Sequence, residues 1–173
     1  MILSLSHSTR RHLTRALPTL LCCAQMMLSS VAANAQSAGP FAGLFGTWRG
    51  AGKVLMADGK SERIRCTATY TPESGGQSLS QELVCASDSY RVDVRSFIVA
   101  EGQSVQGHWE ETVQQATGHL DGQIVGGRLE GRISGTGFEA GLSLVTTGLR
   151  QSVLITPLGG SISRVEVALA RRS

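Results

Sequence analysis

Residues 107–111, Gly-His-Trp-Glu-Glu, form the segment of this chain in which an imidazole lies beside two carboxylates. Alternate side chains of a β-strand share a face, so Glu110 would lie with His108, and Glu111 with Trp109. A histidine oriented by a carboxylate is the arrangement of a general base. No serine or cysteine nucleophile accompanies this pair, and exposed charged pairs are common on strands. We therefore predict no catalytic residues and no enzymatic activity.

Glu111 is the more informative of the two carboxylates because the alternation turns it inward. Beside Trp109, and near Gln81 and Tyr70, it could fix the polar head of a ligand. The alternative places Glu111 at the rim of the fold, satisfied by water or by Arg95. The predicted ligand-binding residues are Trp48, Tyr70, Gln81, Trp109, Glu111 and Phe138.

Metal and phosphate chemistry find no support in the sequence. Cys66 and Cys85 have no histidine or further cysteine within a few residues, which argues against a metal site. Gly126-Gly127 precedes a predicted strand rather than a helix, so the helix dipole and amide nest of a nucleotide site are missing there. We expect neither a metal nor a cofactor.

The first 35 residues have the composition of a secretory signal peptide. Arg10, Arg11 and Arg15 precede an apolar stretch, and Ala33-Asn34-Ala35 has the small-x-small pattern of a cleavage site. The apolar stretch falls short of the ~20 residues that a membrane span requires, which favours a cleaved signal over an anchor. The adjacent arginines leave general secretory and twin-arginine export both open.

Cleavage would change the charge balance of the chain. The sequence has 16 basic and 13 acidic residues, and the signal peptide holds three of the basic ones and none of the acidic ones. The mature chain is therefore formally neutral, and we expect no Lys/Arg cluster that tracks a phosphate backbone or binds an anionic membrane. We predict a periplasmic or secreted protein with no nucleic-acid partner and no membrane span after cleavage.

From residue 46 onward the pattern is that of an all-β domain. Short runs alternate apolar and polar residues, and turn residues such as Asp58-Gly59 separate them. The predicted strands are 46–56, 61–70, 78–87, 90–100, 104–114, 116–125, 128–135, 137–146, 149–156 and 161–170. Short connections favour an up-and-down antiparallel barrel of about ten strands, with a β-sandwich as the alternative. The predicted organisation is a signal peptide over 1–35, a flexible lead-in with little to bury over 36–45, and one barrel domain over 46–171.

The second predicted hairpin provides a test of register. If it is symmetric about Gly75-Gly76, Cys66 lies opposite Cys85, and Tyr70 lies opposite Gln81. The paired cysteines share their face with mainly apolar residues, so the register and the burial pattern agree. In an oxidising compartment this pair would form a disulfide.

The first strand begins Gly46-Thr47-Trp48-Arg49-Gly50-Ala51-Gly52, which resembles the Gly-x-Trp opening of the calycin superfamily, and most of all its nitrobindin and fatty-acid-binding branch. The resemblance implies a ten-stranded barrel in which Trp48 plugs the closed end. Nitrobindin-like proteins hold haem through a histidine near the C-terminus. Here the last predicted strand has no histidine, and alternation turns His108 and His119 outward, so we expect no haem ligation.

The chain also resembles a group of uncharacterised exported bacterial proteins that keep Cys66, Cys85, Gly107-x-Trp109 and Gln151-Ser152-Val153. That resemblance implies no activity. Our leading hypothesis is an exported, non-enzymatic barrel that binds a small apolar or amphipathic molecule in its interior. The alternatives are an envelope protein that acts by surface contact, for instance as a protease or muramidase inhibitor, and a structural component without a pocket.

Overall fold

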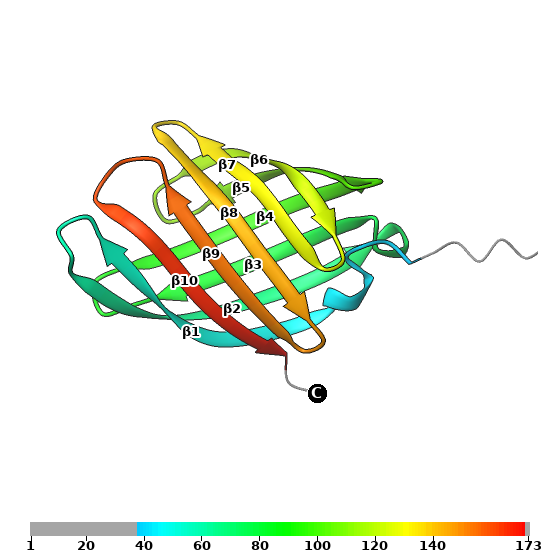
Figure 1. The fold of residues 1–173 in the computed structure, drawn as a ribbon, viewed down its shortest axis with the longest axis horizontal. Helices are drawn as coiled ribbons and strands as arrows, with labels where there is room; N and C mark the ends of the chain where they lie inside the picture. Colours follow the sequence, from blue (N-terminus) through cyan, green and yellow to red (C-terminus); the bar gives the residue numbers. More distant parts are fainter. Residues whose placement is uncertain (1–37, 172–173) are drawn as a thin grey trace, which may run out of the picture. The chain divides into compact units, whose positions relative to one another are not determined.

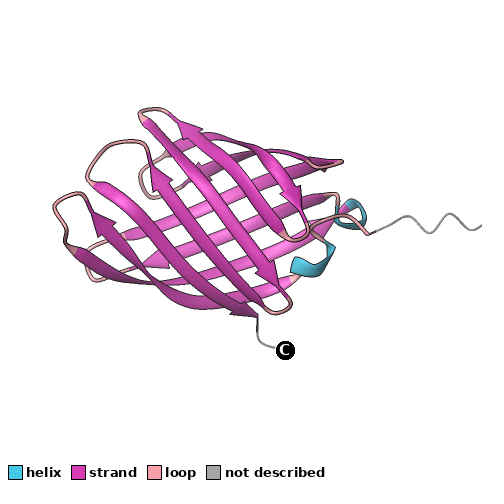
Figure 2. Cartoon of the chain, in the orientation of Figure 1, coloured by secondary structure: helices cyan, strands magenta, loops and turns pink. Residues whose placement is uncertain are grey.

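The structure is a computed structural model, and it describes residues 38–171. The predicted signal peptide lies outside the described residues. Strands make up nearly all of the described part, and the helical content is two 3-10 turns (Figure 2). No helix among the described residues is long and apolar enough to cross a membrane.

Ten strands follow one another in the order of the sequence. Their bounds are β1 (Gly46–Met56), β2 (Ser61–Glu73), β3 (Ser78–Ala86), β4 (Arg91–Glu101), β5 (Ser104–Glu111), β6 (Ala116–Val125), β7 (Arg128–Gly135), β8 (Phe138–Thr147), β9 (Arg150–Pro157) and β10 (Ile162–Arg171). The 3-10 turns are η1 (Ala42–Leu44) and η2 (Ser74–Gly76).

The strands form a closed antiparallel barrel (Figure 1). Each strand pairs with its neighbours in sequence, and β1 pairs with β10 to close the sheet. Positive φ angles at Gly126 and Gly127 allow the tight turn between β6 and β7. Closure pairs every strand on both edges, so the barrel is confirmed and the sandwich alternative is wrong.

The register predicted for the second hairpin is confirmed. Cys66 pairs with Cys85 across β2 and β3, and Tyr70 pairs with Gln81. A disulfide joins Cys66 to Cys85 on the inner face of the wall. The bridge closes a loop with a sequence separation of 19, for which the chain-entropy account gives about 3 kcal/mol of stabilisation.

Trp48 fills the end of the barrel at which β1 begins, here called the closed end. Its side chain is fully buried, and its indole N–H donates to the carbonyl of Leu44 over 2.8 Å. Phe41 and Leu44 are buried around it. The lead-in was expected to bury little, and for residues 41–44 that expectation is wrong, because η1 folds back over the barrel and covers its base.

The opposite end of the barrel, here called the open end, carries the turns that follow β1, β3, β5, β7 and β9. They lie together at the left of Figure 1, away from η1. Strand β5 ends at Glu111, three residues before its predicted end. Residues 112–115 form a turn there, with a positive φ at Gln115. Alternation along the predicted strand 104–114 would turn Val113 inward with Trp109, but Val113 lies in this turn and is 52% exposed.

Candidate ligand site in the barrel interior

One row of paired residues crosses the inner wall from the closed end to the open end. The register joins Tyr70 on β2 to Gln81, Ser96, Trp109, Gly118, Gly135 and finally Phe138 at the start of β8. Because strands in a barrel are tilted, residues that are direct cross-strand neighbours lie progressively nearer the open end from one strand to the next. Four of the six predicted ligand-binding residues lie on this single row.

Trp109 lies flat on a platform made by two glycines. A Cβ atom at Gly118 would lie 2.5 Å from its ring, and one at Gly135 would lie 2.8 Å from it. The ring meets Phe138 edge to face at 6.3 Å between centroids. Its N–H donates to the carbonyl of His119 over 3.2 Å. Trp109 therefore presents an apolar ring, without a free donor, to the interior.

Gln81 and Ser96 are the polar positions in the middle of the row. Their strand neighbours Leu79 and Ile98, two positions away along the chain, are buried on the same inner face. Both residues are partly buried, and neither side chain forms a hydrogen bond with another residue of the described range. An amide and a hydroxyl are thus free to pair with a bound molecule.

Tyr70 lies too deep to play the same part. Its hydroxyl donates to Oε1 of Gln151 over 2.8 Å, and the amide of Gln151 donates to Thr146 over 3.2 Å. Burial raises the pKa of the Tyr70 hydroxyl above its ordinary value, and the hydrogen bond to Gln151 offsets this in part. Tyr70 is therefore a neutral donor in the barrel floor. Gln151 is only 2% exposed. The sequence pattern placed it on a strand but did not indicate this hydrogen bond.

Trp48 and Phe138 occupy opposite ends of the interior. Trp48 packs edge to face on Tyr70 at 6.2 Å and closes the floor. Since it has no exposed surface, it supports the site and does not line it. Phe138 is 41% exposed at the open end, where it forms part of the rim.

Glu111 lies at the rim and its oxygens are already engaged. The carboxylate accepts backbone N–H bonds from Asp93 at 3.0 Å, from Val113 at 3.1 Å and from Gln114. Burial raises the pKa of this carboxyl, but the three N–H groups outweigh burial and hold the pKa below its usual range. Glu111 therefore does not lie near Tyr70, and its carboxylate is already held by backbone amides. Of the two positions considered, the rim is correct, with backbone amides in place of water or Arg95.

The other inward side chains of the barrel wall are mainly apolar and partly exposed to solvent. Inward positions toward the open end are only partly buried, although each lies inside a closed sheet; they include Leu83, Val94, Ile133, Leu142, Val153 and Val165. Below them the core is tightly covered, with Val105 and Trp48 almost wholly buried. The inward side chains are therefore tightly buried at the closed end and less buried toward the open end.

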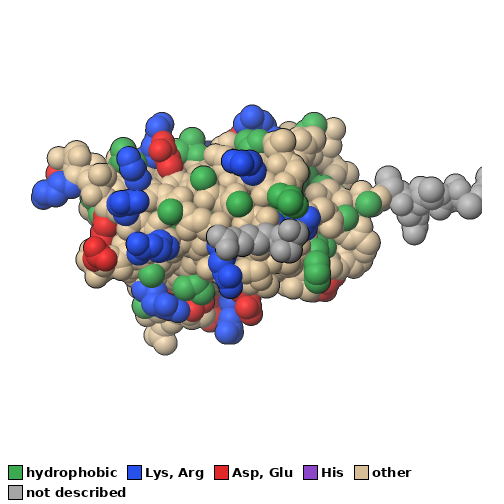
Figure 3. Space-filling model, turned by 90° about the horizontal axis from the view of Figure 1, so that it is seen from below, with side chains coloured by type: hydrophobic (Ala, Val, Ile, Leu, Met, Phe, Trp, Pro, Cys, Tyr) green, Lys and Arg blue, Asp and Glu red, His purple; other side chains and the backbone are tan. Residues whose placement is uncertain are grey.

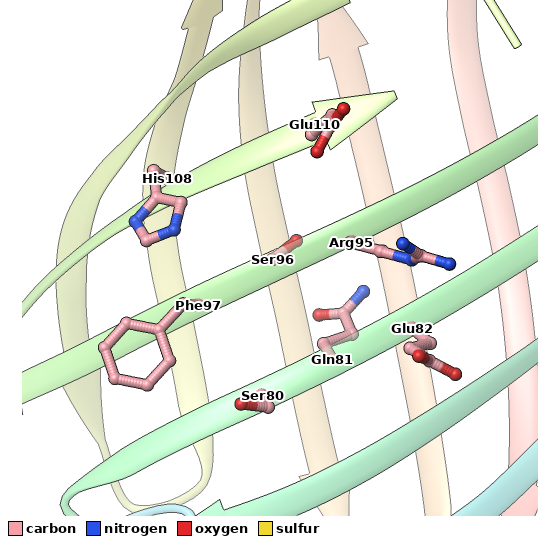
Figure 4. A pocket seen from close by; sticks show the side chains of 8 residues that line it. All are labelled: Ser80, Gln81, Glu82, Arg95, Ser96, Phe97, His108 and Glu110. Carbon is pink, nitrogen blue, oxygen red and sulfur yellow. The ribbon is translucent and has the colours of Figure 1, made fainter. Parts of the chain in front are cut away.

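The outer surface carries a shallow groove of about 270 Å³ across β3, β4 and β5 (Figure 4). Its outward side chains form two cross-strand rows, Ser80–Phe97–His108 and Glu82–Arg95–Glu110. The rings of Phe97 and His108 lie 5.8 Å apart. A second, separate groove of about 390 Å³ lies over β6 and β7. Both follow the pleat of the sheet and lie outside the barrel.

Both histidines of the described part are exposed on the outer face, as alternation predicted, and they pair directly across β5 and β6. No hydrogen bond joins His108 to Glu110 among the residues described. Within the same range, no three His, Cys, Asp or Glu side chains gather as metal ligands would.

No protein-family model matches the chain, and no curated protein matches it either. Solved structures do match. The S-type phycobiliprotein lyase CpeS from Guillardia theta superposes with a TM-score of 0.55 and 12% identity, over 77% of this chain and 90% of that one. Rv2717c from M. tuberculosis also has a TM-score of 0.55, with 11% identity over 76% of this chain and 94% of that one. The chain therefore has a calycin-like barrel fold.

The first of these structures corrects one expectation. The sequence predicted a protein without enzymatic activity, because no nucleophile accompanies His108 and Glu110. A barrel of the same fold is named as a lyase. The missing nucleophile is thus no reason to exclude catalysis in this fold, and the prediction of a non-enzyme is contradicted.

Proposed function

We propose that this barrel binds a small, largely apolar molecule in its interior, which the molecule enters through the open end. The observation that carries the proposal is the inner row from Gln81 to Phe138, in which two free polar groups adjoin an aromatic pair on a solvent-reached wall. Apolar lining with a few convergent polar groups is the usual composition of a small-molecule site.

The lining also indicates the chemistry of the molecule. Toward the open end, the inward charged side chains of the described residues already have hydrogen-bond partners. Glu111 accepts from backbone amides, and Glu62 accepts from Ser89. Arg171 donates to the carbonyls of Gly43 and Phe45 at the closed end. A charged ligand would find no free counter-charge, which favours a neutral molecule with a flat apolar part against Trp109 and one hydrogen-bonding group at Gln81 and Ser96.

Two finer assignments belong with this proposal. We infer that the chain stands nearest the nitrobindin and fatty-acid-binding branch of the calycins, supported by the Gly46-x-Trp48 opening and the plugged end. We also infer export to the periplasm or beyond, supported by the signal-like residues 1–35 and by the Cys66–Cys85 disulfide.

The experiment is a binding titration of a polarity-sensitive hydrophobic dye, followed by native mass spectrometry of protein purified from its own host. Trp109→Phe should alter dye affinity severalfold with little loss of stability, because the ring stays apolar while its area and its bond to the wall change. Gln81→Leu should also alter affinity. Phe97→Ser on the outer groove is the matched control and should leave it unchanged.

Two outcomes would contradict the proposal. One is a wild-type protein that binds no dye and carries no small molecule. The other is binding that Phe97→Ser abolishes and Trp109→Phe leaves intact, which would favour the surface-contact alternative. A retained molecule whose mass changes on incubation would show that the same interior also performs chemistry.

A further inference from the structure

Four apolar side chains stand on the open rim, and each comes from a different turn region. They are Tyr90 at 46% exposure, Val113 at 52%, Phe138 at 41% and Leu158 at 64%. The amide of Gln114 donates to the hydroxyl of Tyr90 over 2.9 Å and so ties two of the turns together. The rim therefore presents separate apolar tips that no described segment covers. The closed end also carries exposed apolar side chains, at Phe45, Val125 and Leu149, but it lies farther from Lys53 and Arg63.

A basic outer face runs along β1 and β2, from Arg49 near the closed end to Lys53 and Arg63 nearer this rim. Outward positions of β1 and β2 hold Arg49, Lys53, Arg63 and Arg65, all exposed. Figure 3 shows several Lys and Arg side chains on this side of the barrel, with some Asp and Glu side chains among them. Lys53 and Arg63 are direct cross-strand partners in the half nearer the open end. The sequence suggested no basic cluster, because these four residues are separated along the chain and only the register brings them onto one face.

Acidic neighbours neutralise this face only in part, because Glu166 on β10 is the direct cross-strand partner of Lys53. On the adjacent β10, Glu166 pairs with Arg164 at 3.0 Å. At the rim, Asp58 pairs with Lys60 at 2.8 Å. The ion pairs found between described residues include none of the four basic side chains named above. Lys53 thus has Glu166 on one side and the like charge of Arg63 directly opposite on the other, and an anionic partner would offset the repulsion between the two cations.

We propose that the open rim and the basic face together dock on the surface of an anionic lipid bilayer. Apolar tips beside Lys and Arg are the composition of an interfacial membrane-binding surface, with the tips at the acyl boundary and the cations at the headgroups. A nucleic acid would use the cations and leave the apolar tips in water. The inference is independent of the proposed interior ligand, because an empty barrel would dock in the same way.

The test is co-sedimentation with vesicles. The chain is expressed in full and purified, and every variant is confirmed by mass to have the same N-terminus, so that any contribution of residues 1–35 is equal throughout. Vesicles of phosphatidylglycerol and phosphatidylethanolamine are compared with phosphatidylcholine vesicles at low and high salt. The wild type should bind the anionic vesicles, release them at high salt, and bind the neutral vesicles at least about tenfold more weakly.

Each half of the surface has its own variant and matched control. Lys53→Thr with Arg63→Thr should weaken binding to anionic vesicles about tenfold or more. Arg128→Thr with Arg150→Thr removes the same charge at the closed end and should leave binding near the wild-type value. Leu158→Ser should also weaken binding, whereas Val125→Ser, a closed-end residue of similar exposure at 57%, should not.

Circular dichroism and the unfolding midpoint establish that each variant is folded, since all six positions are exposed on the surface. Equal binding to both kinds of vesicle, or equal losses from the open-end and closed-end charge variants, would overturn the proposal. So would binding to heparin or to a second protein copy without binding to vesicles, because either would assign the basic face to another partner.

Discussion

At the scale of single residues, the polar groups of this barrel divide into those already satisfied and those left free. Glu111 and Tyr70 looked equivalent to Gln81 as inward polar residues. The structure engages the first two with backbone amides and with Gln151, respectively. Only Gln81, with its neighbour Ser96, keeps hydrogen-bonding capacity toward the interior among these residues.

Glu111 should make the stability of the barrel depend on pH in acid. Its pKa is below the ordinary value in the folded state, so its contribution is present above the unfolded pKa and is lost as the pH falls through the folded one. Glu111→Gln should lower the free energy of unfolding by about 1 to 2 kcal/mol at pH 7. The difference from the wild type should shrink below about pH 4.

Urea unfolding at several pH values measures this difference. Glu110→Gln is the matched control, because Glu110 is exposed on the outer face of the same strand. A stability gap for Glu111→Gln that stays constant down to pH 2 would mean that the turn does not depend on the charged carboxylate.

At the scale of strands, glycines shape the inner wall around Trp109. Gly118 and Gly135 are direct partners on β6 and β7, and together they leave the space that the indole occupies. A side chain at either position would force the ring or the neighbouring strand to move. The glycines therefore determine which aromatic surface faces the interior.

Gly118→Ala should destabilise the protein by about 1 to 3 kcal/mol and alter dye binding, because the new methyl group collides with Trp109 and with the backbone of Ser134. Gly141→Ala on β8 is the matched control. Its added Cβ would meet nothing nearer than 3.9 Å, so the free energy of unfolding should stay within about 0.5 kcal/mol of the wild type. Thermal melts compare the two variants. Equal midpoints would show that the space left by Gly118 beside Trp109 does not matter for stability.

At the scale of the whole molecule, the barrel has two unlike ends. The closed end buries Trp48 under η1, with Phe41 and Leu44 packed beside it. The open end leaves inward side chains partly exposed, while exposed apolar side chains stand at both ends, those of the closed end being Phe45, Val125 and Leu149. This polarity would let one end supply stability while the other receives the proposed ligand and meets the proposed membrane surface.

Trp48→Ala should therefore lower the free energy of unfolding by about 3 to 5 kcal/mol, with or without a bound molecule. Trp109→Phe should cost much less, because it keeps an apolar ring near the open end. Chemical denaturation with and without saturating dye measures both. If Trp48→Ala is mild, or if dye restores its stability fully, the closed end is not the structural base of the barrel.

The sequence by itself determined the strand order, the inward alternation and the Cys66–Cys85 register, because each follows from the two-residue period of a strand and from short turns. It also placed Trp109 and Gln81 on the inner face. Only the tertiary structure decided that Glu111 caps a turn, that Tyr70 binds Gln151 and that Lys53 faces Arg63 near an apolar rim. Those outcomes depend on contacts between residues that are distant in sequence and on local turns that end a strand early. The two-residue periodicity of the sequence contains information about neither.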